Sequence, residues 1–83
     1  MRNRLIENIK KTTSNYEEVN NIFVVYDERD RIVLSVYSDL IVINLCNVAR
    51  VSIYIEDITD IIPQNNHDMF SIVFGRNNVS LDL

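Results

Sequence analysis

Three segments of this chain are hydrophobic at nearly every position, and this feature most limits how it can fold. They are residues 22–26, 40–45 and 69–74. A β-strand points successive side chains to opposite faces, so each of these strands would be apolar on both faces. The rest of the chain offers one short amphipathic helix as a cover. Either the sheet closes into a small bent barrel with the helix outside, or a partner covers the second face, and a homodimer is the predicted form of that partner.

The N-terminal residues 3–12 are predicted to form this helix, because Leu5, Ile6 and Ile9 recur at helical spacing. Ser14 followed by Glu17 fits a capping box, which predicts one further helical turn over residues 16–20. Two turns of amphipathic helix are marginal alone, so this segment must dock on the sheet.

From residue 22 onward the pattern is typical of β-strands joined by polar turns. The clearest case is residues 48–55, where Val51, Ile53 and Ile55 alternate with polar neighbours. Residues 56–62 leave two alternatives, because their isoleucine spacing suits a helical turn whereas Pro63 disfavours helix and suits an edge strand. The predicted strands are 22–26, 31–37, 40–45, 48–55, 69–74 and 79–83, with turns at 27–30 and 75–78 and a polar loop at 64–68.

The 83 residues fit a single domain, with a helical N-terminal segment at 1–21 and a β-rich body at 22–83. Sequence-adjacent strands pair as hairpins, so the predicted fold class is α+β. The N-terminal helix would precede a five- to six-stranded, mainly antiparallel sheet.

Composition argues against several classes of function. Twelve acidic and eight basic residues give a net charge of −4, which disfavours direct binding to nucleic acid or to an anionic membrane. Cys46 is the one cysteine, and no apolar stretch is long enough for a signal peptide or a membrane span. These features predict a cytoplasmic protein.

No residue pattern points to catalysis, a metal or a cofactor. Cys46 and His67 are the one possible thiol and base pair, but an apolar strand and a polar loop are their expected settings. The Glu56, Asp57 and Asp60 cluster lacks the alternation of a calcium loop, and Gly75 alone cannot build a phosphate-binding loop. We therefore predict no cofactor, no metal and no enzymatic activity.

Charge is divided unevenly along the chain, since residues 1–11 carry a net +3 and the remainder a net −7. Two acidic clusters lie in expected turns, and two interpretations of these acids remain. They are either groups that keep a β-rich protein in solution, or mimics of phosphate spacing that occupy a basic groove on a nucleic-acid-handling protein. Tyr54, expected on an exposed strand face, could add to such an interface. The candidate partner-binding residues are Asp27, Glu28, Asp30, Tyr54, Glu56, Asp57 and Asp60.

One stretch resembles a known family. The segment at 38–47, Ser-Asp-Leu-Ile-Val-Ile-Asn-Leu-Cys-Asn, followed by Tyr54-x-x-x-Ile58-x-x-Ile61-Ile62-Pro63, is similar to the bacterial Sm-like RNA chaperones of the Hfq type. The resemblance covers residues 38–63. It implies an N-terminal helix followed by five bent antiparallel strands, a ring assembly and RNA binding.

Two departures from that family bear on function. Its Lys-His pair after the tyrosine falls at Ile55 and Glu56, and its strand-bending glycine falls at Val33, so the resemblance supports the barrel more than the RNA site. Residues 53–83 are also similar to the bacterial pleckstrin-like pattern of an Asp-Ile-x-x-Ile strand before a closing hairpin.

Size, acidity and the lack of a cofactor site make this chain similar in type to small phage-encoded inhibitors such as anti-CRISPR proteins. The sequence therefore predicts a non-enzymatic protein-binding module that blocks a nucleic-acid-handling host complex through an acidic surface. The alternative is a ring-forming, Sm-like RNA-binding protein.

Overall fold

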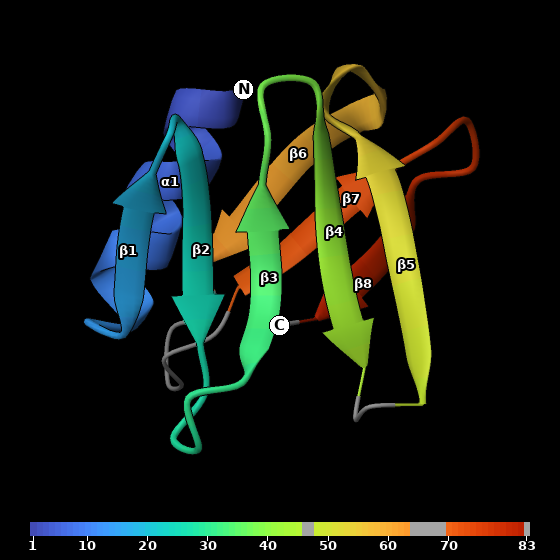
Figure 1. The fold of residues 1–83 in the computed structure, drawn as a ribbon. Coiled ribbons are helices and arrows are strands. Elements are labelled where there is room, and N and C mark those ends of the chain that lie inside the picture. The colour runs from blue at the N-terminus through green and yellow to red at the C-terminus, as the bar shows by residue number, and fades with distance from the viewer. Residues whose placement is uncertain (46–47, 64–69, 83) are drawn as a thin grey trace.

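A computed structural model describes residues 1–45, 48–63 and 70–82, which form one helix and eight strands (Figure 1). The α+β class predicted from the sequence is confirmed. In chain order the elements are α1 (Arg2–Thr12), β1 (Tyr16–Val19), β2 (Ile22–Tyr26), β3 (Ile32–Val36), β4 (Leu40–Leu45), β5 (Ala49–Tyr54), the 3₁₀ turn η1 (Ile55–Asp57), β6 (Ile58–Pro63), β7 (Phe70–Phe74) and β8 (Val79–Asp82).

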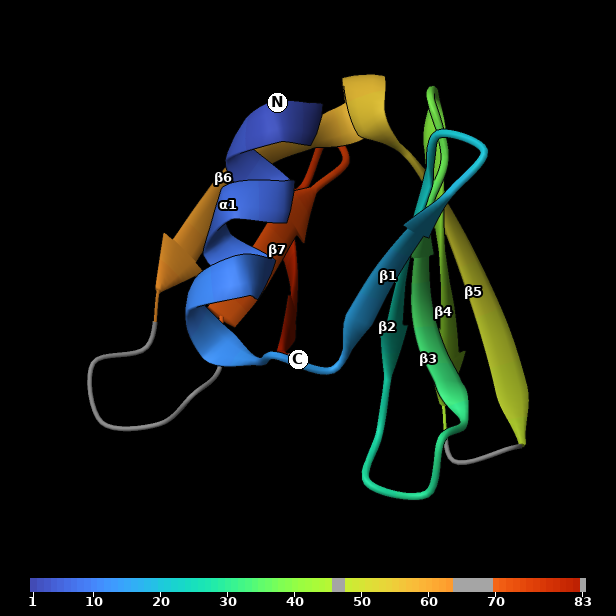
Figure 2. The ribbon, with the colours of Figure 1, turned by 60° about the vertical axis from the view of Figure 1, so that its left-hand side comes forward.

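The strands form two antiparallel sheets in place of the single sheet that was predicted. β1 to β5 pair in sequence order, and β6 to β8 form a separate three-stranded sheet. Seen from the edge, the five-stranded sheet is one layer, and α1 together with β6–β8 forms the other (Figure 2). The barrel expectation was wrong, because β1 and β5 lie at opposite edges of their sheet and β6 pairs with β7.

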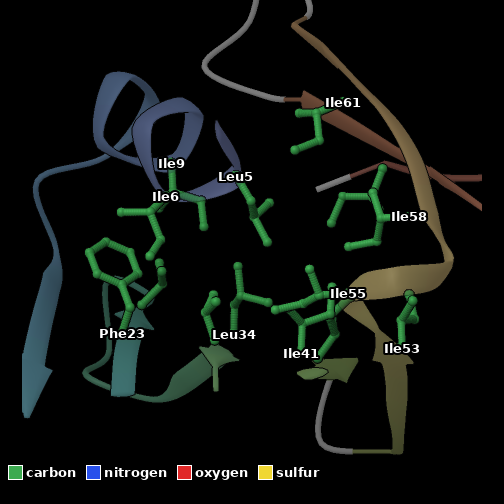
Figure 3. Close-up of a cluster of buried hydrophobic side chains, with 14 residues drawn as sticks. Leu5, Ile6, Ile9, Phe23, Leu34, Ile41, Ile53, Ile55, Ile58 and Ile61 are labelled. Atoms are coloured by element: carbon green, nitrogen blue, oxygen red, sulfur yellow. The ribbon is translucent and has the colours of Figure 1, made fainter. Parts of the chain in front are cut away.

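The hydrophobic core fills the space between the two layers. In Figure 3 the helix residues Ile6 and Ile9 lie over Phe23 of β2, while Ile58 lies over Ile41 of β4. The buried hydrophobic residues are Leu5, Ile6, Ile9, Phe23, Val25, Leu34, Val36, Ile41, Ile43, Ile53, Ile55, Ile58, Ile61 and Ile72. One face of the five-stranded sheet is thus covered by the chain itself. Over β3 to β5 most of this cover is the β6–β8 sheet, whereas the helix alone was predicted as a cover.

The segment after α1 differs from the prediction. Residues 16–19 form strand β1, which pairs with β2 through a tight turn at Asn20 and Asn21, so the expected extra helical turn is wrong. Both asparagines have positive φ, 52° and 66°, as the two central residues of a type I′ hairpin turn require. A strand gains more here than a helical turn, because Tyr16 stacks on buried Phe23 with ring centroids 5.0 Å apart.

Both alternatives for residues 56–62 occur, one after the other. η1 supplies the helical turn, and β6 is a strand that ends at Pro63. The pairing of β6 with β7 shifts register between Ile58 and Asp60, which is the mark of a β-bulge. The bulge explains how Ile58 and Ile61, three positions apart, are both buried within a strand.

The helix is held by arginines at its first turn. The Arg2 guanidinium donates to the carbonyl oxygens of Tyr37 at 2.8 Å and Asn21 at 2.9 Å, which ties the helix to two turns of the five-stranded sheet. Within the described part of the chain, this helix is too short and too polar to cross a membrane.

Candidate protein-binding surface

The two predicted acidic clusters lie at opposite ends of the five-stranded sheet. Asp27, Glu28 and Asp30 belong to the β2–β3 turn, and Glu56 and Asp57 belong to η1, beside the β3–β4 turn at the other end (Figure 1). The two clusters therefore cannot contact one flat partner surface together, and they form two separate sites.

In the β2–β3 turn, the side chain of Asp27 forms hydrogen bonds with the backbone. Its carboxylate accepts from the N–H groups of Arg29 at 2.8 Å and Arg31 at 3.0 Å. These two hydrogen bonds, first that from Arg31 and then that from Arg29, lower the pKa of Asp27 below its ordinary 3.8. The turn residue Asp30 has a φ of 58°, a left-handed conformation that Asp tolerates better than most residues. Since arginines alternate with the acids here, this end carries little net charge.

The carboxylate of Asp60 on β6 also forms hydrogen bonds within the chain. Its carboxylate accepts from the N–H of Ile61 at 2.8 Å and forms an ion pair with Arg4 at 2.8 Å. The backbone hydrogen bond and then the Arg4 side chain lower the pKa of Asp60. Because Arg4 also donates to the carbonyl of Ile61 at 3.0 Å, this pair joins α1 to β6. Asp60 therefore acts in the contact between the helix and the smaller sheet.

Three further acids gather at the opposite end of the five-stranded sheet. Asp39, Glu56 and Asp57 are exposed, and so is Tyr54, whose side chain is 56% accessible. Asp39, Tyr54 and Glu56 line the same open hollow of about 490 Å³. We call these four residues the acidic end.

Backbone hydrogen bonds fix the geometry of the acidic end. The N–H of Ile55 donates to the carbonyl of Asp39 at 2.9 Å, and the N–H of Gly75 donates to the carbonyl of Asp57 at 3.0 Å. Gly75 adopts a φ of 77°, which suits a residue without a β-carbon. Three separate turns are thus joined there. In the described residues the one ion pair is that of Arg4 with Asp60, so Asp39, Glu56 and Asp57 form no ion pair there.

The sheet face that points away from the core is a second candidate surface. Strand register places its side chains in rows that run across the sheet. One row, next to the acidic end, holds Val19, Ile22, Tyr37, Leu40 and Tyr54. The next holds Glu17, Val24, Ser35, Val42 and Ser52, and the third includes Tyr26, Asn44 and Arg50. We call these rows the outer face.

Apolar side chains in the centre of the outer face are only partly covered. Ile22, Val24, Leu40 and Val42 are half-buried by their neighbours within the sheet, and Val19 is 51% accessible. Charged groups lie at the two edges, with Glu17 on β1 and Arg50 on β5. The prediction that Tyr54 lies on an exposed strand face is confirmed, and Arg50 and Ser52 share that face.

The described residues contain no group of three or more His, Cys, Asp or Glu side chains able to hold a metal ion. Cys46, His67 and the predicted 64–68 loop lie outside the described residues, so the thiol and base pair stays unplaced. The predicted lack of a cofactor and of enzymatic activity stays a prediction.

Sequence reasoning missed Asp39, which belongs to no acidic run and approaches Glu56 only through the β3–β4 turn.

Comparisons with protein families, with curated proteins and with solved structures found no match to this chain.

Proposed function

We propose that this chain is a non-enzymatic protein-binding module that uses its acidic end to occupy a basic groove of a nucleic-acid-handling complex, as a small inhibitor would. The observation that carries the proposal is the acidic end itself, with three exposed carboxylates on backbone tied by hydrogen bonds beside an exposed tyrosine. Fixed carboxylates imitate the charge of successive phosphates, and opposite charge steers such partners together.

Charge elsewhere supports the same assignment. At the β2–β3 turn the acids alternate with Arg29 and Arg31, and Asp60 is paired with Arg4. Of the seven residues predicted for partner binding, the proposal therefore keeps Tyr54, Glu56 and Asp57 as contacts and adds Asp39. Asp27 and Asp60 become structural residues under this proposal, and Glu28 and Asp30 become solvated turn residues.

A charge-reversal experiment tests this assignment. The immobilised protein captures proteins from bacterial lysate over a salt series, and each captured protein is then assayed for nucleic-acid binding with and without the module. The proposal predicts a captured nucleic-acid-binding protein whose DNA or RNA the module displaces, with capture falling steeply as salt rises.

The test pair is Glu56→Lys with Asp57→Lys at the acidic end, and the control pair is Glu28→Lys with Asp30→Asn at the β2–β3 turn; they raise the net charge by 4 and by 3. The first pair should reduce capture at least tenfold, because truncating or reversing charges at a complementary interface costs about 1.4 kcal/mol or more. The second pair should leave capture unchanged. Equal capture by both variants, or a partner that holds its nucleic acid in the presence of the module, would contradict the proposal.

The Sm-like alternative rests on the order of elements, since a helix followed by five antiparallel strands is what that resemblance implies. Under this alternative the chain would form a ring and bind RNA. Sedimentation as six or seven copies, together with a mobility shift of a single-stranded RNA, would favour the alternative over the inhibitor.

A further inference from the structure

We infer that a second copy of this chain packs on the outer face, with a two-fold axis parallel to the strands that passes over the central strand β3. The outer face borders the acidic end and shares Tyr54 with it, but the inference does not depend on the proposed function. It begins from the apolar centre of the outer face, which the chain itself leaves open. Half-buried Ile22, Val24, Leu40 and Val42 lie there between two polar edges.

The strand order makes this face complementary to itself. β3 is the middle of five strands, so the axis places β2 of one copy over β4 of the other and β1 over β5. Register then brings Val24 over Val42 of the second copy, and Ile22 over Leu40 of the second copy. Both matches join apolar side chains.

On the axis, the small residue Ser35 of β3 faces its own copy, and Tyr37 does so in the row next to the acidic end. Ser35 is in the middle row of β3, between Val24 and Val42, and is only 8% accessible because those larger neighbours rise around it. Two Ser35 residues facing each other leave room for the valines on either side to interdigitate. Aligned sheets pack in this way at a separation of about 10 Å.

Charge selects this axis over the other possible one. With the axis parallel to the strands, Glu17 at the β1 edge faces the β5 edge of the second copy, which carries Arg50 one row away. That step is about 7 Å along the strand, within reach of a glutamate and an arginine side chain together. An axis across the strands through the middle row would instead place Glu17 over Glu17, which is unfavourable.

The same charges disfavour other occupants of this face. Among the described residues of this face Arg50 is the one cation, so a nucleic acid would find little to replace its counterions. Five strands about 4.8 Å apart and three rows about 7 Å apart give a footprint of roughly 500 Å² before side-chain relief is counted. Standard interfaces bury about 800 Å² per partner, so the expected dimer is at the small end and dissociates on dilution.

Sedimentation velocity over a protein concentration series tests the inference on the full chain. The wild type should show a reversible monomer–dimer equilibrium. Val42→Asp should weaken the dimer at least a hundredfold, because it places two carboxylates in the apolar centre of the interface. Val42 is half-exposed in the monomer, so far-UV circular dichroism should confirm that the variant folds.

Charge exchange tests the orientation. Glu17→Arg and Arg50→Glu should each weaken the dimer roughly tenfold, since each turns two attractive contacts per dimer into repulsive ones. The double variant should return to within about threefold of the wild type. A wild type that stays monomeric at millimolar concentration, a ring of six or seven copies, or a dimer unaffected by Val42→Asp would each overturn the inference. A double variant no tighter than either single one would overturn the proposed axis.

Discussion

At the scale of single residues, the charges of this chain divide into those that hold the fold and those left free. Arg2 and Arg4 use their guanidinium groups to tie α1 to the two sheets, and Asp60 and Asp27 receive hydrogen bonds from the backbone. The net positive charge of the N-terminal segment therefore has a structural use. The predicted clusters could not show this, because the role of a carboxylate depends on which N–H groups the fold brings to it.

Stability against pH should report these structural acids. Asp27 and Asp60 have pKa values below the ordinary 3.8, so their contribution to stability is complete above that value and is lost as the pH falls through the folded-state pKa. We expect a flat melting temperature from about pH 7 to pH 5 and a steep fall below pH 4.

The variants Asp27→Asn and Asp60→Asn should each make this fall shallower, measured by thermal unfolding followed with circular dichroism. Glu28→Gln is the control, because Glu28 is exposed and receives no such bonds in the described structure. A pH profile that keeps its slope when both aspartates are replaced would contradict the assigned roles.

At the scale of elements, β-branched and aromatic runs between polar turns predicted the strands whose partners are neighbours in the chain, and alternation predicted β5. β2 and β4, which are apolar on both faces in the sequence, bury every second residue, whereas in β5 Ile53 is buried and Val51 is half-buried. β1 was missed because Ser14 and Glu17 fit a capping box, although Asn20 and Asn21 carry the signal of a hairpin turn. β6 was ambiguous because Ile58 and Ile61 are spaced as in a helix, and a strand can bury both only through its bulge.

The β1–β2 turn offers a direct test of that hairpin. Asn21 has a φ of 66°, so Asn21→Gly should leave the free energy of unfolding unchanged or raise it slightly. Asn21→Val should lower it by about 1–2 kcal/mol, because a β-branched residue is strained in the left-handed region. Chemical denaturation measures both values. Equal stability of the two variants would show that this turn is not the one described.

At the scale of the whole molecule, the five-stranded sheet has apolar side chains on both faces, and the chain itself covers only one of them. The β6–β8 sheet joins α1 in covering the inner face, which no local pattern could predict because it depends on β6 leaving β5 to pair with β7. On the outer face, Ile22, Val24, Leu40 and Val42 stay partly exposed. In the inferred dimer the axis parallel to the strands sets both acidic ends at the same end of the assembly, so a partner with a long basic groove would meet six carboxylates in place of three.

In the inferred dimer, the outer face is covered by a second copy of the chain. Isotope-filtered NMR on an equal mixture of ¹³C-labelled and unlabelled protein measures contacts between copies directly. We predict intermolecular cross-peaks between the methyl groups of Val24 and Val42, and between those of Ile22 and Leu40. A millimolar sample in which these four methyl-bearing residues show contacts only within their own chain would contradict the claim.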